Sequence, residues 1–202
     1  MAMRIGVDFD NTIVCYDTLF HRLAVSRCLI PTDLPPTKGE IRDFLRRSGR
    51  EGAWTELQGE VYGAHIVDAE PFPGALEFIR CCRDHGITPY VVSHKTRYPI
   101  LGEHHDLHAA GHRWLTAHGF YDVAGGGLTP DRVYFELTKE AKLNRIVVLQ
   151  CDVFIDDLPE FLAEPGFPAG VRRILFDPSG TPGAGPAMLR ARSWSEVEAL
   201  LG

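Results

Sequence analysis

The chain has 202 residues, of which 45% are hydrophobic and 24% are charged, and its formal net charge is −6 at pH 7. These proportions are typical of a globular protein large enough to bury a core, and they exclude a disordered or membrane-spanning chain. The acidic balance, with no basic stripe, argues against a nucleic-acid partner. The sequence has no apolar run near 18 residues, and its five cysteines lack the spacing of a disulfide framework, so we expect no membrane contact and a cytoplasmic location.

The first predicted element is a short buried strand from Ile5 to Phe9, a run rich in β-branched and aromatic residues. Asp8 and Asp10 lie at its C-terminal tip, where open α/β sheets bind ligands. Their spacing of two residues directs both side chains the same way along an extended backbone. One carboxylate could act as a nucleophile and the other could carry protons, although these residues alone fit a simple turn equally well.

Residues 16–70 interrupt this pattern because they contain no convincing strand. Three helices are predicted there, over 18–30, 37–47 and 51–65, and a capping-box pattern that starts at Thr37 supports the second one. The rest of the chain alternates between helices and strands, which is typical of a parallel sheet. The predicted helices cover 75–85, 104–118, a segment that begins at 139, and a short final segment after Ser193; the predicted strands cover 87–92, 133–135, 151–156 and 171–176, and 180–186 is a predicted Gly/Pro loop.

Two of these later strands also end in polar residues. Ser93 follows the strand over 87–92, and its hydroxyl could hydrogen-bond a phosphoryl oxygen. Asp156 and Asp157 end the strand over 151–156, so in a parallel sheet they would converge with the first two aspartates. Four carboxylates that close repel one another unless a cation neutralises them, and a hard divalent ion such as Mg²⁺ suits oxygen ligands. Lys139, at the start of a helix, would add positive charge for phosphate binding.

Taken in order, these pieces resemble the four motifs of the haloacid dehalogenase (HAD) superfamily of phosphohydrolases. The matches are D-x-D-x-[TV] at residues 8–12, Ser93, Lys139 with Lys142 as the alternative, and the pair Asp156 and Asp157. The resemblance implies a Rossmann-like parallel sheet with helices on both faces. It also implies that residues 16–70, which lie between the first two motifs, form a small helical cap, while residues 1–15 and 71–202 form the α/β core.

The resemblance further implies a set of catalytic roles. Asp8 would attack phosphorus and form an aspartyl-phosphate, and Asp10 would protonate the leaving group and then activate water. Mg²⁺ would be held by Asp8, by the backbone carbonyl of Asp10, and by Asp156 or Asp157. Ser93 and Lys139 would hold the phosphoryl oxygens. Relatives that dehalogenate lack an acid at the position of Asp10, so this residue favours phosphate ester hydrolysis.

The substrate is less well defined by the sequence. The predicted substrate-binding residues are Asn11, Thr12, His94, Lys95, Arg97 and His105. His104, His108 and His112 are spaced for one helix face, which indicates a substrate-facing row, a second metal site or, with more weight than the metal site, a solvated surface. We expect a small phosphorylated metabolite as substrate and a monomer or homodimer. The alternatives are a 5′-nucleotidase-type phosphatase, a phosphotransferase and a catalytically silent binding protein.

Overall fold

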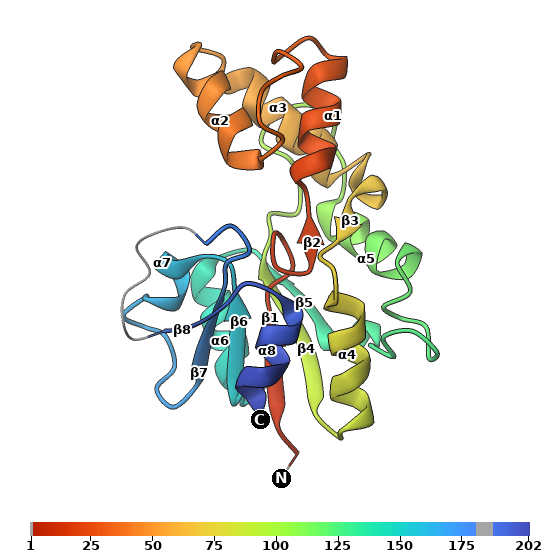
Figure 1. Ribbon diagram of the computed structural model, residues 1–202, viewed down its shortest axis with the longest axis vertical. Coiled ribbons are helices and arrows are strands. Elements are labelled where there is room, and N and C mark those ends of the chain that lie inside the picture. The colour runs from red at the N-terminus through yellow and green to blue at the C-terminus, as the bar shows by residue number, and fades with distance from the viewer. Residues whose placement is uncertain (1, 181–187) are drawn as a thin grey trace.

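The computed structural model describes residues 2–180 and 188–202, so most of the predicted Gly/Pro loop at 180–186 lies outside the described residues. A six-stranded sheet with the order β5-β4-β1-β6-β7-β8 forms the centre of the molecule, and every neighbouring pair is parallel (Figure 1). Its strands are β1 (Arg4–Val7), β4 (Thr88–His94), β5 (Val133–Glu136), β6 (Val153–Asp156), β7 (Arg172–Phe176) and β8 (Leu189–Ala191). The predicted parallel α/β fold is confirmed.

The register of the central strands explains why polar residues gather at one edge. β1 lies between β4 and β6, and Val7 pairs with Val91 on one side and with Ile155 on the other. The residues that follow these partners therefore leave the sheet at the same edge. Close packing holds this centre together: a Cβ atom on Gly6 would overlap the ring of Phe154, so the position requires glycine.

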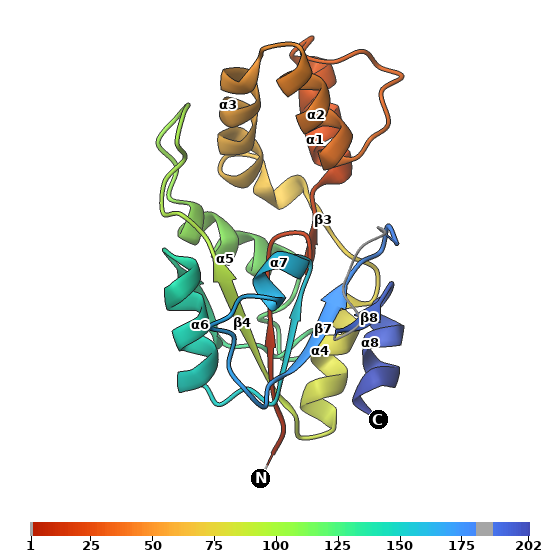
Figure 2. The same cartoon turned by 90° about the vertical axis from the view of Figure 1, so that its left-hand side faces the viewer.

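Helices cover both faces of the sheet, as predicted (Figure 2). On one face, α4 (Ala75–Asp84), α5 (Leu107–Ala117) and α8 (Trp194–Leu201) contribute to a large apolar core that includes the fully buried Trp114. On the other face, α6 (Lys139–Val148) and the short α7 (Pro159–Leu162) pack on a second core around Phe154. In the described part of the chain, no helix combines the length and apolar character needed to cross a membrane.

Residues 16–70, here called the helical module, lie beyond the carboxyl edge of the sheet (Figure 1). The module contains α1 (Asp17–Ser26), α2 (Lys38–Arg47), α3 (Glu51–Tyr62) and the 3-10 turn η1 (Ile66–Asp68). Its entry and exit form a small antiparallel ribbon of β2 (Val14–Cys15) and β3 (Glu70–Pro71), which the sequence did not predict. The predicted cap on α2 is confirmed, because the Thr37 hydroxyl accepts a hydrogen bond from the Glu40 amide at 3.3 Å.

Three helices are shorter than predicted, and β8 and the 3-10 turn η2 (Pro130–Arg132) were not predicted. The helix predicted over 18–30 ends at Ser26, and Cys28 then has a φ of 53°. The helix predicted over 51–65 ends at Tyr62, before Gly63. The helix predicted over 104–118 begins only at Leu107, because the Asp106 carboxylate accepts a hydrogen bond from the Ala109 amide at 2.9 Å and caps it there.

Candidate active site

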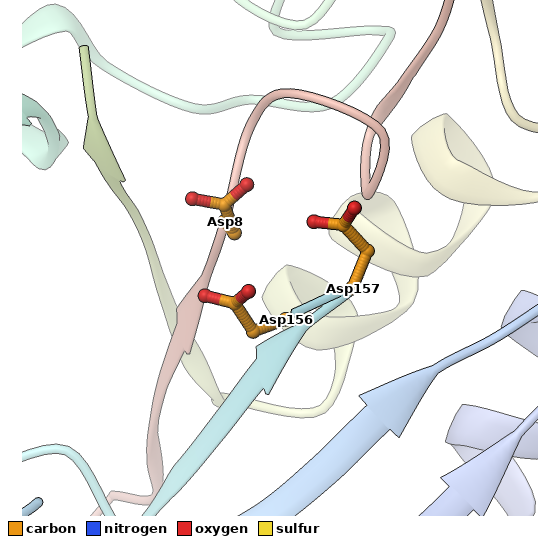
Figure 3. Close-up of side chains that lie close together, drawn as sticks. All are labelled: Asp8, Asp156 and Asp157. Carbon is orange, nitrogen blue, oxygen red and sulfur yellow. The ribbon is translucent and has the colours of Figure 1, made fainter. Parts of the chain in front are cut away.

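Three aspartates converge at the carboxyl edge of the sheet. Asp8 follows β1, Asp156 is the last residue of β6, and Asp157 comes directly after it. Their side chains face a common space (Figure 3), and one carboxylate oxygen from each lies within 4.8 Å of the others. This is the convergence that the strand order predicts. Thr12 is fully buried beneath this cluster, where its hydroxyl donates a 3.4 Å hydrogen bond to Asp157.

Asp10 has different surroundings from Asp8, although the alternation predicted a common direction. Both oxygens of its carboxylate lie 2.9 Å from Nζ of Lys95, and Oδ1 also accepts a 2.5 Å hydrogen bond from the hydroxyl of Tyr16. Asn11, the next residue, has a φ of 59° and turns the chain away from the sheet. Asp10 therefore faces the helical module, while Asp8 faces the aspartate cluster.

The lysine that meets the cluster is Lys142, the alternative candidate, and not Lys139. Nζ of Lys142 lies 2.5 Å from Oδ1 of Asp8 and 2.6 Å from Oδ2 of Asp156. Lys139 is at the first position of α6, its side chain is 47% exposed, and its ammonium lies 4.0 Å from Glu164. One turn later along the helix, Lys142 faces the sheet and is buried. Lys139 still borders the cavity above the cluster.

The electrostatics of the cluster favour a bound cation. Burial raises the pKa of Asp8 to about 7; the charge of Asp156 adds to this shift, and Lys142 opposes it. Burial and the charges of Asp156 and Asp8 also raise the pKa of Asp157 well above its ordinary value. One ammonium is therefore too little positive charge for this group of carboxylates. Buried carboxylate oxygens this close together fit a hard divalent ion such as Mg²⁺, so the residues present suit the predicted cofactor.

The pKa of Asp10 shifts in the other direction. Burial raises it, but the ammonium of Lys95 and the hydroxyl of Tyr16 together lower it by more. Asp10 is thus held as a carboxylate with two proton donors in contact. Lys95 was predicted to bind substrate, and the structure instead buries it against Asp10.

Two adjoining cavities lie above these residues. The inner cavity, of about 170 Å³, is lined by Asp8, Asp10, Asn11, Ser93, His94 and other residues. The outer cavity, of about 420 Å³, lies between the core and the helical module and is lined by Tyr16, Arg42, Phe72, Phe176 and other residues. Asn11, Lys38, Asp157 and Leu158 border both cavities. The predicted positions of Ser93 and His94 beside the nucleophile are consistent with this arrangement.

Four predicted substrate-binding residues line neither cavity: Thr12 and Lys95, which are buried as described above, and Arg97 and His105. Arg97 forms an ion pair with Asp106 at 2.9 Å. The ring of His105 lies 3.3 Å from the carboxylate of Glu103 and packs against Gly63 of the helical module. Both residues belong to the long connection between β4 and α5, which extends past the site and contacts α3.

The predicted histidine stripe does not form, because His104 precedes the helix. His104 stacks on Tyr98 with ring centroids 3.9 Å apart. His108 lies 2.8 Å from the carbonyl oxygen of Lys95, and His112 lies 2.5 Å from the hydroxyl of Tyr121. Each ring thus has its own partner, and among the described residues the only group placed to hold a metal is the aspartate cluster.

Two module residues that reach the site, Tyr16 and Lys38, are not among the predicted catalytic, substrate-binding or metal-binding residues. The signal that could have found Lys38 is the distribution of lysine. The chain has four lysines among its 21 lysines and arginines, and all four lie at this site: Lys38, Lys95, Lys139 and Lys142.

No known protein-family profile and no curated protein sequence matches the chain. Its structure does resemble solved structures over nearly the full length of both chains. A HAD family hydrolase from Deinococcus radiodurans R1, with bound phosphate and sodium, has a TM-score of 0.62 and 16% identity, over 99% of this chain and 95% of that one. The HAD-hydrolase YfnB from Bacillus subtilis, bound to magnesium, has a TM-score of 0.58 and 14% identity, over 100% and 99%. A haloacid dehalogenase-like hydrolase from Burkholderia xenovorans LB400 has a TM-score of 0.57 and 14% identity, over 99% and 96%.

The chain has the fold of the HAD-superfamily hydrolases, which confirms the fold that the resemblance implied. At these identities the likeness concerns the fold, and the similar structures include a dehalogenase as well as the phosphate-bound hydrolase. The reaction has to be argued from the residues of the site.

Proposed function

We propose that this protein is a Mg²⁺-dependent phosphomonoester hydrolase that works through an aspartyl-phosphate intermediate. The observation that carries the proposal is the pair formed by Asp8 and Asp10. Asp8 lies in the aspartate cluster with Lys142, and Asp10 lies beside it with proton donors in contact. A nucleophile and a separate proton carrier at the same cavity are what hydrolysis of a phosphate ester requires.

The reaction would have two steps. In the first, a carboxylate oxygen of Asp8 attacks phosphorus, the bond from phosphorus to the ester oxygen breaks, and Asp10, which carries the proton taken from water in the preceding turnover, gives that proton to the departing alkoxide. In the second, water attacks the phosphorus of the aspartyl-phosphate and passes a proton to Asp10, which releases phosphate and restores Asp8. The ion pair with Lys95 and the Tyr16 hydrogen bond favour the carboxylate form of Asp10, which the second step needs.

The surrounding residues would bind and orient the substrate. Asp8, Asp156 and Asp157 would hold Mg²⁺, which supplies positive charge that neutralises the phosphate and orients it for attack. Lys142 fixes the position of the Asp8 carboxylate through its 2.5 Å contact, and Ser93 offers a hydroxyl to the phosphoryl oxygens.

Asp10 also bears on the choice between phosphate and halide chemistry. A halide leaves as an anion and needs no proton. A carboxyl group placed to donate a proton to the leaving group would therefore serve no purpose in dehalogenation. An alkoxide is a strong base and does need one. The contacts of Asp10 therefore favour phosphate esters over 2-haloacids as substrates.

Turnover of 4-nitrophenyl phosphate with and without MgCl₂ tests the proposal. We expect phosphate release that EDTA abolishes, and a phosphoryl group on the peptide that contains Asp8 when the reaction is quenched in acid. The matched control is Asp84→Asn, because Asp84 is a surface acid paired with Arg83. Chloride release from 2-chloropropionate without phosphatase activity would contradict the proposal.

A further inference from the structure

Lys38 is the cation that the helical module contributes to the site. It is the first residue of α2, and its backbone amide donates to the Asp17 carboxylate at 2.8 Å. Its side chain borders both the inner and the outer cavity. The ammonium lies 5.6 Å from the ring centroid of Tyr62 and 6.0 Å from that of Phe20, so aromatic rings form one side of its surroundings.

Lys38 differs from the other lysines of the site because it lacks an anionic partner. Lys95 is paired with Asp10, and Lys142 is paired with Asp8 and Asp156. Among the residues that the structure describes, no carboxylate oxygen lies within 4 Å of Nζ of Lys38. Burial lowers the pKa of Lys38, but Tyr62 and the charges of Asp157 and Asp10 raise it by more, so the side chain is a cation.

Two acids of the outer cavity, Asp17 and Asp177, have a backbone or cationic partner. Asp17 accepts the Lys38 amide, and Asp177 lies 3.3 Å from the guanidinium of Arg190. Arg42, one turn further along α2, also lines this cavity, and its guanidinium is paired with Asp43 at 2.8 Å. Among the described residues, no atom lies within 4 Å of a Cβ placed on Gly39, so none of them fills this first turn, where the helix dipole favours an anion.

The path of the leaving group links the two cavities. The ester oxygen must lie near Asp10, which protonates it under the proposed function. Tyr16 bonds Asp10 at 2.5 Å and also lines the outer cavity. The group attached to that oxygen therefore extends from the inner cavity past Lys38 into the outer one.

We propose that Lys38 is a specificity-determining residue that binds a second anionic group, a carboxylate or a second phosphate, on the leaving-group side of the substrate. The substrate class is then phosphate monoesters of anionic alcohols. This inference rests on the proposed phosphatase function and adds to it the chemistry of the leaving group. The charges of Asp157 and Asp10 act on this half-buried ammonium without direct contact, and an anionic group of the substrate would give it a direct partner.

Three esters with the same three-carbon chain test the inference: propyl phosphate, 3-phosphooxypropanoate and 1,3-propanediol bisphosphate. The quantity measured is kcat/KM with MgCl₂ for wild type, Lys38→Gln and Lys38→Arg. The matched control is Arg46→Gln, which removes a charge from the same helix where the side chain is 51% exposed and paired with Glu51.

We expect wild type to prefer at least one anionic ester over propyl phosphate by about tenfold, the usual size of a charge-assisted contact. This ratio should fall close to one in Lys38→Gln, persist in part in Lys38→Arg, and stay unchanged in Arg46→Gln. The anionic ester that loses most in Lys38→Gln identifies the second group as carboxylate or phosphate. A wild-type ratio of one, or a ratio that survives in Lys38→Gln, would overturn the inference.

Inhibition provides a second measurement that does not depend on the variants folding. The product 3-hydroxypropanoate should inhibit wild-type hydrolysis of propyl phosphate more strongly than 1-propanol does, and equal inhibition would count against an anion site. If wild type hydrolyses none of the three esters in the presence of Mg²⁺, the proposed phosphatase function fails. If wild type hydrolyses all three with equal kcat/KM, only the inference about Lys38 fails.

Discussion

The hydroxyl of Tyr16 donates a 2.5 Å hydrogen bond to Oδ1 of Asp10, which joins the first residue of the helical module to the proposed proton carrier of the core. Tyr16 is fully buried, and its pKa is raised well above the ordinary value by burial and by the charge of Asp10. It therefore keeps its proton and acts on Asp10 as a permanent donor. Through this contact the module would take part in the proposed chemistry as well as cover the site.

Tyr16→Phe should slow turnover and change its pH dependence. Loss of the donor raises the pKa of Asp10, because this hydrogen bond lowers it. The acidic limb of the kcat profile, where Asp10 must be a carboxylate to accept a proton from water, should move to higher pH, and kcat should fall by about tenfold. Tyr98→Phe, at a tyrosine that is 42% exposed, is the control. An unchanged acidic limb would show that Tyr16 has only a packing role.

Asp8→Asn should abolish turnover without unfolding the protein. The amide is close in shape to the carboxylate but cannot form the aspartyl-phosphate. We expect kcat below about a hundredth of the wild-type value, measured with 4-nitrophenyl phosphate alongside a circular dichroism spectrum. A folded variant with more activity than this would rule out Asp8 as the nucleophile.

Lys142→Met and Lys139→Met should differ greatly. Removal of Lys142 leaves Asp8 and Asp156 buried without their cation, so the metal-free protein should lose about 3–5 kcal/mol of unfolding free energy. Lys139 has only an exposed 4.0 Å contact with Glu164, so its removal should cost less than about 1 kcal/mol. Urea unfolding measures both values, and equal losses would contradict the assignment of Lys142 to the site.

The stability of the metal-free protein should depend on pH through Asp8. Its pKa rises from 3.8 in the unfolded chain to about 7 in the folded one, so between these values the folded chain holds a proton that the unfolded chain has released. Asp8 therefore lowers the unfolding free energy progressively as the pH rises from 3.8 to about 7, and below this range it has no such effect. The raised pKa of Asp157 acts in the same direction.

Urea unfolding at about pH 5 and pH 8 tests this linkage. Wild type should lose more stability than Asp8→Asn between the two pH values, and MgCl₂ should restore wild type at the higher pH because a bound cation stabilises the carboxylates. The difference in unfolding free energy between wild type and Asp8→Asn is the quantity to compare. If this difference is the same at both pH values, with or without Mg²⁺, the raised pKa of Asp8 is contradicted.

The parts of this structure that depend on local sequence were predictable. The strand that ends in Asp8 and the strand that ends in Asp156 are short apolar runs followed by acids, and parallel pairing brings such ends together. The choice between Lys139 and Lys142 was not predictable in this way, because residues three apart lie on the same side of a helix and the choice depends on how far along α6 the aspartates meet it.

Tertiary contacts decided the residues that the sequence left open or misplaced. The predicted histidine stripe required a helix that begins at residue 104. The Asp106 cap starts the helix later, so the ring of His104 lies outside it, apart from those of His108 and His112. Arg97 has a carboxylate within its own loop. The contact of Tyr16 with Asp10 and the place of Lys38 depend on how the helical module lies over the sheet, and no local pattern contains that information.

The distribution of lysine has a practical consequence. The arginines supply the positive charge elsewhere in this protein, while all four lysines lie at the candidate site on the carboxyl edge of the sheet. Amine-directed coupling, such as attachment of a dye or of a solid support through an activated ester, normally modifies residues far from function. Here the most exposed of the four lysines, Lys139, borders the inner cavity, so such coupling would modify the site at which we propose that the substrate binds. Cys28, which is exposed on the helical module, offers a safer point of attachment.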